Sequence, residues 1–226
     1  MTFKNVITHF HLADNDTDDQ LLCSLHGWIP RKEPNIKIID AFLFSLEFDL
    51  LEIRLRELWP VVDIFIVMEA DHTFSGQPKP LWLQKKFSEH FQWAAEKLKI
   101  YHCQDLRPLQ DGQNPFVNEI RMRNCMTWTI RSLAKSGDLI IVGDVDEIPR
   151  RSTIDLFRRC DEYPEIVHLQ MKTYFYSFEF YYSWDDFWQA KVQIFDRKRF
   201  YYSHQKGGDY LLADSGKLAV IINDYY

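Results

Sequence analysis

The segment from residue 138 to residue 149, Asp-Leu-Ile-Ile-Val-Gly-Asp-Val-Asp-Glu-Ile-Pro, restricts the possible folds more than any other part of the chain. Its four apolar residues, 139–142, predict a strand that is buried on both faces, as in a parallel sheet covered by helices. Gly143 permits a sharp turn after this strand. Three carboxylates follow, at Asp144, Asp146 and Glu147. Because α/β proteins bind ligands just beyond the carboxyl ends of such strands, this acidic turn predicts a binding site.

The spacing of Asp144 and Asp146 suits a divalent metal ion. Both carboxylates can reach one hard cation, which keeps coordination positions open for the phosphate oxygens of a substrate. Two alternatives compete with a metal site. Ser152 and Asp155 form a capping-box pattern, so the acidic residues could simply precede a helix. Haloacid-dehalogenase phosphatases also begin with this spacing, but they need a small hydroxyl residue where Ile148 stands.

From residue 36 onward the chain alternates strand and helix signals, which predicts an α/β fold with a mainly parallel sheet flanked by helices. An irregular lead-in is expected before it, over residues 1–35. Strands are expected at 37–44, 61–68, 100–103 and 139–142, and helices at 48–59, 81–98 and a third that ends near 135. The composition suits one domain with a substantial core.

Charge and segment composition exclude several classes of protein. A net charge of −6 argues against nucleic-acid binding, which requires clustered Lys and Arg. No apolar segment is long enough to span a bilayer, and no secretory signal pattern is visible. The four cysteines lack the spacing of a zinc site and are expected to be buried thiols, although their even number permits disulfides.

Two further residues are candidates for contacts with a nucleotide. Arg123 precedes the acidic turn on the predicted helix and could clamp phosphate oxygens with two parallel hydrogen bonds, as could Arg121. Glu69 ends the strand predicted at 61–68 much as Asp144 ends its own strand. It could accept a hydrogen bond from the base or the ribose of a nucleotide, or it could have a structural role at the strand end.

An aromatic segment at 174–182, Tyr-Phe-Tyr-Ser-Phe-Glu-Phe-Tyr-Tyr, is followed by Trp184. Alternation with period two predicts that most of these rings pack in the core and that the others lie on a face. Rings on such a face can stack on the C–H surfaces of a sugar. The candidates for such stacking on a sugar are Tyr181, Tyr182 and Trp184.

Five sequence blocks in order carry a resemblance to a known family. They are residues 38–44, 47–58, 65–71 with Thr73 and Phe74, 76–80 and 143–149. Together they resemble glycosyltransferase family 17, and the similarity covers residues 34–216. Several long blocks in order are far more specific than a single Asp-x-Asp motif.

The resemblance implies a transferase of the GT-A type, with a Rossmann-like nucleotide-binding sheet. It implies UDP-N-acetylglucosamine as the donor and a divalent metal, with Mn²⁺ expected first and Mg²⁺ as the alternative. It also implies a mannose of an N-glycan as the acceptor, which the three aromatic candidates would contact. The β-1,4 linkage would form with inversion, and the protein would reside in the Golgi lumen. Asp144 and Asp146 would hold the metal, and Asp146 and Glu147 would be catalytic. Glu147 is the first candidate for the general base, with Asp209 and Asp214 in a glycine-rich stretch as alternatives. Asp214 is also a candidate for contact with the acceptor.

The chain departs from the family pattern after residue 216. Residues 217–226 are a divergent tail, so the resemblance predicts a family member that is altered or truncated at this point, with a transferase domain over 36–216. Two functions follow. The first is an active metal-dependent glycosyltransferase, and the second is an inactive relative that only binds a nucleotide sugar or a protein partner.

Overall fold

The computed structural model describes residues 6–8, 18–32, 35–175, 177–187, 190–203 and 220–223. Its strands are β1 (Val6–Thr8), β2 (Ile29–Pro30), β3 (Ile38–Phe44), β4 (Ile64–Ala70), β5 (Leu98–Cys103), β6 (Leu139–Val142), β7 (Cys160–Asp161), β8 (Ile166–Tyr174), β9 (Tyr181–Phe187), β10 (Lys191–Ile194) and β11 (Val220–Asn223). Its helices are α1 (Asp19–Leu25), α2 (Phe48–Leu58), α3 (Trp82–His90), the short 3₁₀ helix η1 (Gln92–Ala94), α4 (Phe116–Leu133) and α5 (Arg151–Arg159).

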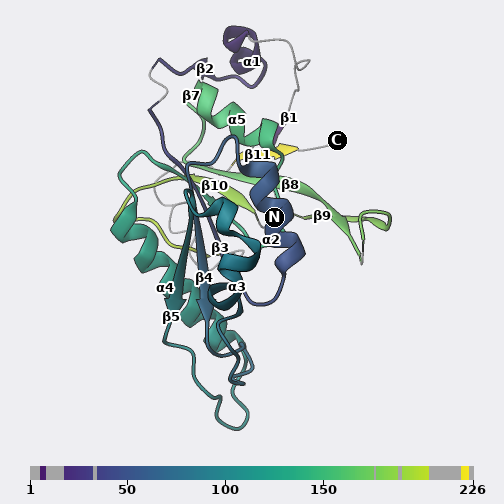
Figure 1. Cartoon of the computed structure of the whole chain (residues 1–226). Helices are drawn as coiled ribbons and strands as arrows, with labels where there is room; N and C mark the ends of the chain where they lie inside the picture. The colour runs from purple at the N-terminus through teal and green to yellow at the C-terminus, as the bar shows by residue number, and fades with distance from the viewer. Residues whose placement is uncertain are drawn as a thin grey trace.

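One large sheet organises the molecule, which confirms the predicted α/β class (Figure 1). The strand order is β1, β11, β8, β10, β6, β3, β4, β5, with β9 paired to β8, and β2 and β7 form a separate small sheet. Strands β6, β3, β4 and β5 are parallel, whereas β10 is antiparallel to both β6 and β8. The sheet is therefore mixed. Parallel neighbours need a crossover connection, and among the described residues no helix lies between β8 and β10 in the chain.

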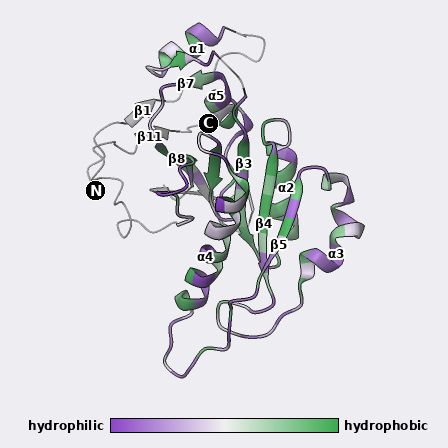
Figure 2. Cartoon of the chain, turned by 90° about the vertical axis from the view of Figure 1, so that its left-hand side faces the viewer, coloured by the Kyte–Doolittle hydropathy of each residue, from purple (hydrophilic) through white to green (hydrophobic). Residues whose placement is uncertain are grey.

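Side chains of the parallel strands alternate between two hydrophobic cores, one on each face of the sheet. Phe42 of β3 faces the core that α2, α3 and α5 cover, and the next residue, Leu43, faces the core under α4. Figure 2 shows hydrophobic colouring along β3 and β4 in the middle of the molecule. All four residues of β6 are buried, as the sequence predicted. The sheet thus holds the carboxyl ends of β3, β4 and β6 rigidly beside one another.

Helix α1 corrects the expectation of an irregular lead-in before residue 36. The side chain of Asp18 caps this helix and accepts a hydrogen bond from the backbone N–H of Leu21 at 3.0 Å. This is the N-cap arrangement that short polar side chains favour. Among the described residues no helix is both long and apolar enough to cross a membrane.

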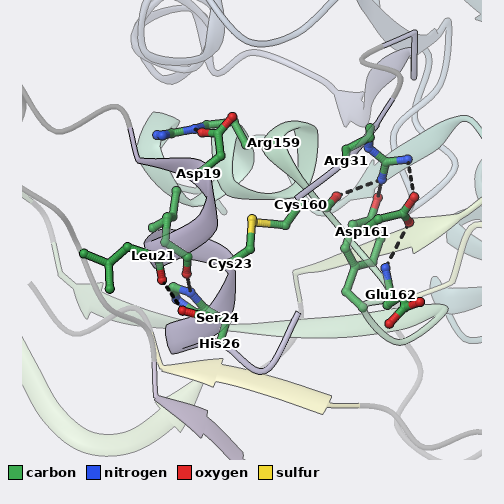
Figure 3. The surroundings of a disulfide bond; sticks show 12 residues. Asp19, Leu21, Cys23, Ser24, His26, Arg31, Arg159, Cys160, Asp161 and Glu162 are labelled. Carbon is green, nitrogen blue, oxygen red and sulfur yellow. Dashed lines mark hydrogen bonds and ion pairs between the residues drawn. A yellow bond between two sulfur atoms is a disulfide. The ribbon is translucent and has the colours of Figure 1, made fainter. Parts of the chain in front are cut away.

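A disulfide joins Cys23 of α1 to Cys160 at the end of α5, across a sequence separation of 137 (Figure 3). Arg31 strengthens the same junction by donating to the carbonyl oxygen of Cys160 at 2.9 Å and to Asp161 at 3.2 Å. The N-terminal helix is therefore covalently attached to the rest of the fold.

A second disulfide joins Cys103 at the end of β5 to Cys125 of α4. The expectation of buried thiols was wrong, because the fold brings both cysteine pairs into bonding distance and no described cysteine is free. Sequence spacing could not show this, since partners that are far apart in the chain meet only after folding. The Cys103–Cys125 bond fixes α4 against the edge of the parallel strands.

Two local predictions were also wrong. Helix α5 begins at Arg151 after the N-cap residue Arg150, so Ser152 lies inside the helix and the capping box does not form there. The aromatic segment is a hairpin rather than one alternating strand, because β8 ends at Tyr174 and β9 starts at Tyr181. Those rings of the hairpin turn that the structure describes are exposed rather than packed in the core, and Phe178 is 66% exposed.

Candidate active site

A pocket of about 530 Å³ opens at the carboxyl ends of the parallel strands. Its walls are formed by the end of β3 with the turn after it, the first turn of α2, the loop after β4, the middle of α4 and the acidic turn after β6. The lining residues are Leu43, Phe44, Ser45, Glu47, Leu50, His72, Thr73, Phe74, Ser75, Lys79, Met122, Arg123, Asp144, Val145 and Asp146. A cavity at this place in an α/β sheet is where ligands are expected.

Three of the residues predicted to bind a metal or a diphosphate meet in this pocket. Asp144 and Asp146 lie in its wall, and Arg123 reaches them from α4. The Nη2 atom of Arg123 donates to Oδ1 of Asp144 at 3.2 Å, and its Nε donates to Glu119 at 2.9 Å. Arg121, the alternative to Arg123, instead donates to Asn118. The structure therefore distinguishes the two arginines, which the sequence did not.

Burial and a neighbouring charge change the pKa of a carboxylate in the acidic turn. Burial in the pocket, together with the negative charge of Asp144, raises the pKa of Asp146. The Nη1 atom of Arg123 is buried and has no hydrogen-bond partner among the described residues. A buried guanidinium N–H without a partner is costly, so an oxygen-bearing anion in the pocket would stabilise this arrangement.

Glu147 is turned away from the pocket, which does not favour the role of base that the sequence suggested. Its side chain is buried, and Oε2 accepts a hydrogen bond from the backbone N–H of Asp144 at 2.9 Å. Burial, together with the charges of Asp144 and Asp146, raises the pKa of Glu147 to about 8. The contact closes the turn on itself, so Glu147 shapes the loop that presents the two aspartates.

A buried ion pair that the sequence did not identify holds the acidic turn from behind. Arg54 of α2 and Asp40 of β3 are both fully buried, and their closest atoms lie 2.7 Å apart. The Nη1 atom of Arg54 also donates to the backbone oxygens of Asp144 at 2.7 Å and Glu147 at 2.8 Å. Arg54 therefore links the sheet, helix α2 and the acidic turn.

Tyr202, which is packed in the core under α4, supports the same turn from that face of the sheet. Its hydroxyl donates to the backbone oxygen of Gly143 at 2.7 Å, and its ring lies 5.6 Å from the guanidinium carbon of Arg123. Thr127 of α4 accepts a hydrogen bond from the backbone N–H of Tyr202 at 3.1 Å. These contacts position Arg123 as well as the start of the turn.

Glu69 lies inside β4 and is not a lining residue of the pocket. Its two carboxylate oxygens accept hydrogen bonds from the backbone N–H groups of Leu83 at 2.9 Å and Gln84 at 3.2 Å. Glu69 thereby caps helix α3, where a negative charge is stabilised by the helix dipole. The geometry favours the structural role over a contact with uracil or ribose.

Comparison with known proteins shows the family of the chain. The sequence model of glycosyltransferase family 17 matches residues 2–220 of the chain. The chain belongs to glycosyltransferase family 17. This match extends the family resemblance on both sides of the range inferred from the five blocks.

Three curated relatives of this family 17 chain share the name beta-1,4-mannosyl-glycoprotein 4-beta-N-acetylglucosaminyltransferase, from Rattus norvegicus, Homo sapiens and Mus musculus. Each is 30% identical over 155 residues, which are 66% of this chain and 28% of the relative. The chain thus matches somewhat more than a quarter of the length of these relatives.

The sequence blocks that resemble family 17 contain many of the residues that line or support the pocket, although Met122 and Arg123 of α4 lie outside them. Asp40 and Arg54 lie in the first two blocks, Lys79 in the fourth, and the acidic turn in the fifth. The sequence contains a signal for the buried ion pair of Asp40 and Arg54. Asp40 interrupts an apolar strand, and Arg54 lies on the apolar stripe of α2. Charged residues at core positions are rarely placed there without a partner.

The aromatic candidates for acceptor binding in this family 17 chain lie in a different part of the molecule. Tyr181 is exposed at the start of β9 and is not a lining residue of the pocket. Tyr182 and Trp184 belong to the same strand, and their side chains lie outside the described part of the chain. Asp214 also lies outside the described residues.

The donor atoms of the acidic turn fit a hard divalent cation. Asp144 and Asp146 offer carboxylate oxygens from one short turn that faces the pocket, and such oxygens suit Mn²⁺ or Mg²⁺. Within the described residues, one group of three potential ligands, Cys103, Asp105 and Cys125, has its ligand atoms within 4.8 Å of one another. Its two cysteines form a disulfide, so their sulfur atoms are not available as thiolate ligands. Asp144 and Asp146 are therefore the residues of the pocket that would hold such a cation, which would supply positive charge there.

Proposed function

We propose that this chain is a metal-dependent, inverting glycosyltransferase that moves N-acetylglucosamine from UDP-N-acetylglucosamine to a mannose of an N-glycan, forming a β-1,4 linkage. The observation that carries the proposal is the convergence of Asp144, Asp146 and Arg123 in one pocket at the strand ends. The names of the three relatives support the sugar and the acceptor. The parallel strands β6, β3, β4 and β5 support a GT-A type fold for the nucleotide-binding half.

In this proposal each pocket residue has a separate task. Asp144 and Asp146 hold the divalent cation, which when bound neutralises negative charge that develops on the UDP leaving group. The Nη1 atom of Arg123, which has no hydrogen-bond partner within the described part of the chain, donates to a phosphate oxygen. The Nη2 atom of the same side chain holds Asp144 in position. Arg54 and Tyr202 keep the acidic turn at a fixed distance from the sheet. Fixed donors and charges of this kind make the largest contribution to the stabilisation of the transition state in many enzymes.

The Golgi lumen is the proposed location. The two disulfides support an oxidising compartment, because such bonds persist in secretory compartments and are rare in the cytosol.

One observation favours the alternative, a relative that binds nucleotide sugar without transferring it. Glu147, the first candidate for the base, is buried behind the turn. A donor that binds only the folded protein raises the melting temperature. A melting shift with UDP-N-acetylglucosamine and Mn²⁺ that is not accompanied by transfer would support this alternative.

The deciding experiment is a donor-hydrolysis and transfer assay with several UDP-sugars, with and without a chelator. Asp144→Ala and Asp146→Ala should each lower metal-dependent turnover by about 10²-fold or more, since each removes a ligand of the charge-stabilising cation. Asp111→Ala is the matched control, because Asp111 is an exposed aspartate outside the pocket walls. Full metal-dependent turnover by Asp144→Ala would contradict the proposal.

A further inference from the structure

The loop after β4, residues 71–79, is folded into a compact hairpin that ends at Lys79. The backbone N–H of Lys79 donates to the carbonyl oxygen of Asp71 at 2.7 Å. Within the loop, the N–H of Thr73 donates to Gln77 at 2.8 Å. This β4 loop forms one wall of the pocket through its residues His72 to Ser75 and Lys79.

Neighbouring segments fix the β4 loop from outside. Gly76 has φ +79°, and a Cβ at this position would lie 2.7 Å from the backbone nitrogen of Leu109, so only glycine fits. Asn118 of α4 donates from Nδ2 to the backbone oxygens of Phe74 at 3.2 Å and Arg107 at 2.7 Å. The position of Lys79 is therefore set by the fold.

The amine of Lys79 is buried without a hydrogen bond. Its side chain is 9% exposed, and Nζ has no hydrogen-bond partner among the described residues. The closest carboxylate oxygen, Oε1 of Glu69, is 3.8 Å away and already accepts a backbone hydrogen bond from Leu83. Burial lowers the pKa of Lys79, although the charges of Glu69, Glu47 and Asp71 act in the opposite direction. A buried amine in this state is stabilised when a ligand supplies an acceptor oxygen.

We propose that Lys79 binds the diphosphate of the donor, as a second cationic contact from the β4 loop in addition to Arg123 from α4. The two residues line the same pocket, and each carries a buried donor atom without a hydrogen-bond partner among the described residues. Two such donors around one cavity match an anion with several oxygens. This inference rests on the proposed function only in naming a nucleotide diphosphate as the ligand.

A purely structural role for Lys79 makes a different prediction. If Lys79 serves only as the counter-ion of buried Glu69, its removal destabilises the fold and leaves anion binding by the folded protein unchanged. If Lys79 binds the diphosphate, anion affinity falls even where the variant is fully folded.

The test is calorimetric titration of the full chain with inorganic pyrophosphate and Mn²⁺. Lys79→Gln should weaken pyrophosphate binding by about tenfold or more, because a charge-assisted hydrogen bond is lost. Lys79→Arg should restore part of this affinity. Lys85→Gln is the matched control, since Lys85 is an exposed lysine on α3 outside the pocket walls, and its affinity should stay within about twofold of the wild type.

A second measurement on the unaltered protein covers the case in which Lys79→Gln does not fold. Prolonged acetylation labels a buried amine through transient opening of the structure, and mass spectrometry should show that pyrophosphate slows the labelling of Lys79 several-fold and leaves that of Lys85 unchanged. An affinity of Lys79→Gln within twofold of the wild type overturns the inference, as does unprotected Lys79 or the absence of pyrophosphate binding to the wild type.

The outcomes separate this inference from the proposed function. Pyrophosphate binding that depends on Lys79, without turnover of any UDP-sugar, would retain the inference and reject the transferase. Turnover of UDP-N-acetylglucosamine by the wild type with unchanged pyrophosphate binding in Lys79→Gln would reject the inference alone.

Discussion

The acidic turn after β6 and the hairpin between β8 and β9 differ in how the rest of the protein constrains them. The turn receives hydrogen bonds or packing from α2, from α4 and from Tyr202, and its backbone oxygens bind a buried arginine. The hairpin turn leaves large rings exposed, including Phe178 and Phe180. A fixed turn suits a site where metal and phosphate must be held at short distances. Exposed rings suit a surface that meets a large and variable ligand.

The largest effect is expected from breaking the support behind the turn. Arg54→Ala should lower the free energy of unfolding by about 3–5 kcal/mol, because Asp40 would be left as a buried charge without a partner. Urea denaturation measures this change.

The matched control lies on the same helix. Arg56 forms an i,i+4 ion pair with Glu52 on the surface, where its side chain is 62% exposed. Arg56→Ala should change the free energy of unfolding by less than about 1 kcal/mol. Similar losses for the two variants would show that the turn is not specially supported.

The next effect concerns the disulfide that anchors α4. Replacing both Cys103 and Cys125 by serine should cost about 3 kcal/mol, because the bond closes a loop across a sequence separation of 22 and restricts the unfolded chain. Thermal or denaturant unfolding of the double variant gives the value. A cost below about 1 kcal/mol would mean that packing alone fixes α4, which carries Arg123.

A smaller effect is expected from Lys191 of β10, behind the turn. Burial and the nearby charge of Arg123 lower the pKa of Lys191 from 10.5 to about 8. Between these two values the unfolded chain binds more protons, so the contribution of Lys191 to stability rises with pH. From pH 7 to pH 9 the wild type should gain about 1 kcal/mol relative to Lys191→Met.

The comparison with Lys191→Met is needed because another buried group titrates in the same range. The pKa of Glu147 is raised from 4.5 to about 8, so its effect on stability falls as pH rises towards that value. Glu147 is present in both proteins and cancels in the difference between them. A difference that does not vary with pH would show that the amine of Lys191 is not buried as described.

The smallest effect on stability is expected at the hairpin. Tyr181→Ala and Phe178→Ala should each change the free energy of unfolding by about 0.5 kcal/mol or less, because both rings are exposed. If the hairpin contributes to the acceptor site, Tyr181→Ala should weaken the binding of an N-glycan in a titration. A loss of stability above about 2 kcal/mol would show that the rings are packed, which would remove the contrast with the turn.

The elements that were predicted well are those encoded by local patterns. Strand β6 was expected at 139–142 and occupies Leu139–Val142, and the strand expected at 37–44 is Ile38–Phe44. Runs of apolar residues and nearby helix signals determine these segments without reference to distant parts of the chain.

Features that depend on contacts between distant residues were predicted poorly. The pairing of Cys23 with Cys160 and the inward turn of Glu147 arise only when the tertiary structure forms. The sequence correctly placed Asp144, Asp146 and Arg123 near one another, because strand ends and a preceding helix converge in α/β folds. It could not choose the base or identify Lys79, whose burial results from the packing of the β4 loop against other segments.

In the proposed function, the acidic turn holds a cation that in turn holds the diphosphate of the donor. The most direct measurement is the anomalous diffraction of a crystal grown with Mn²⁺ and UDP-N-acetylglucosamine. We expect a manganese peak in contact with the carboxylates of Asp144 and Asp146, with the phosphates of the nucleotide beside it and in contact with Arg123. Bound nucleotide elsewhere on the protein, with both aspartates directed to water, would contradict it.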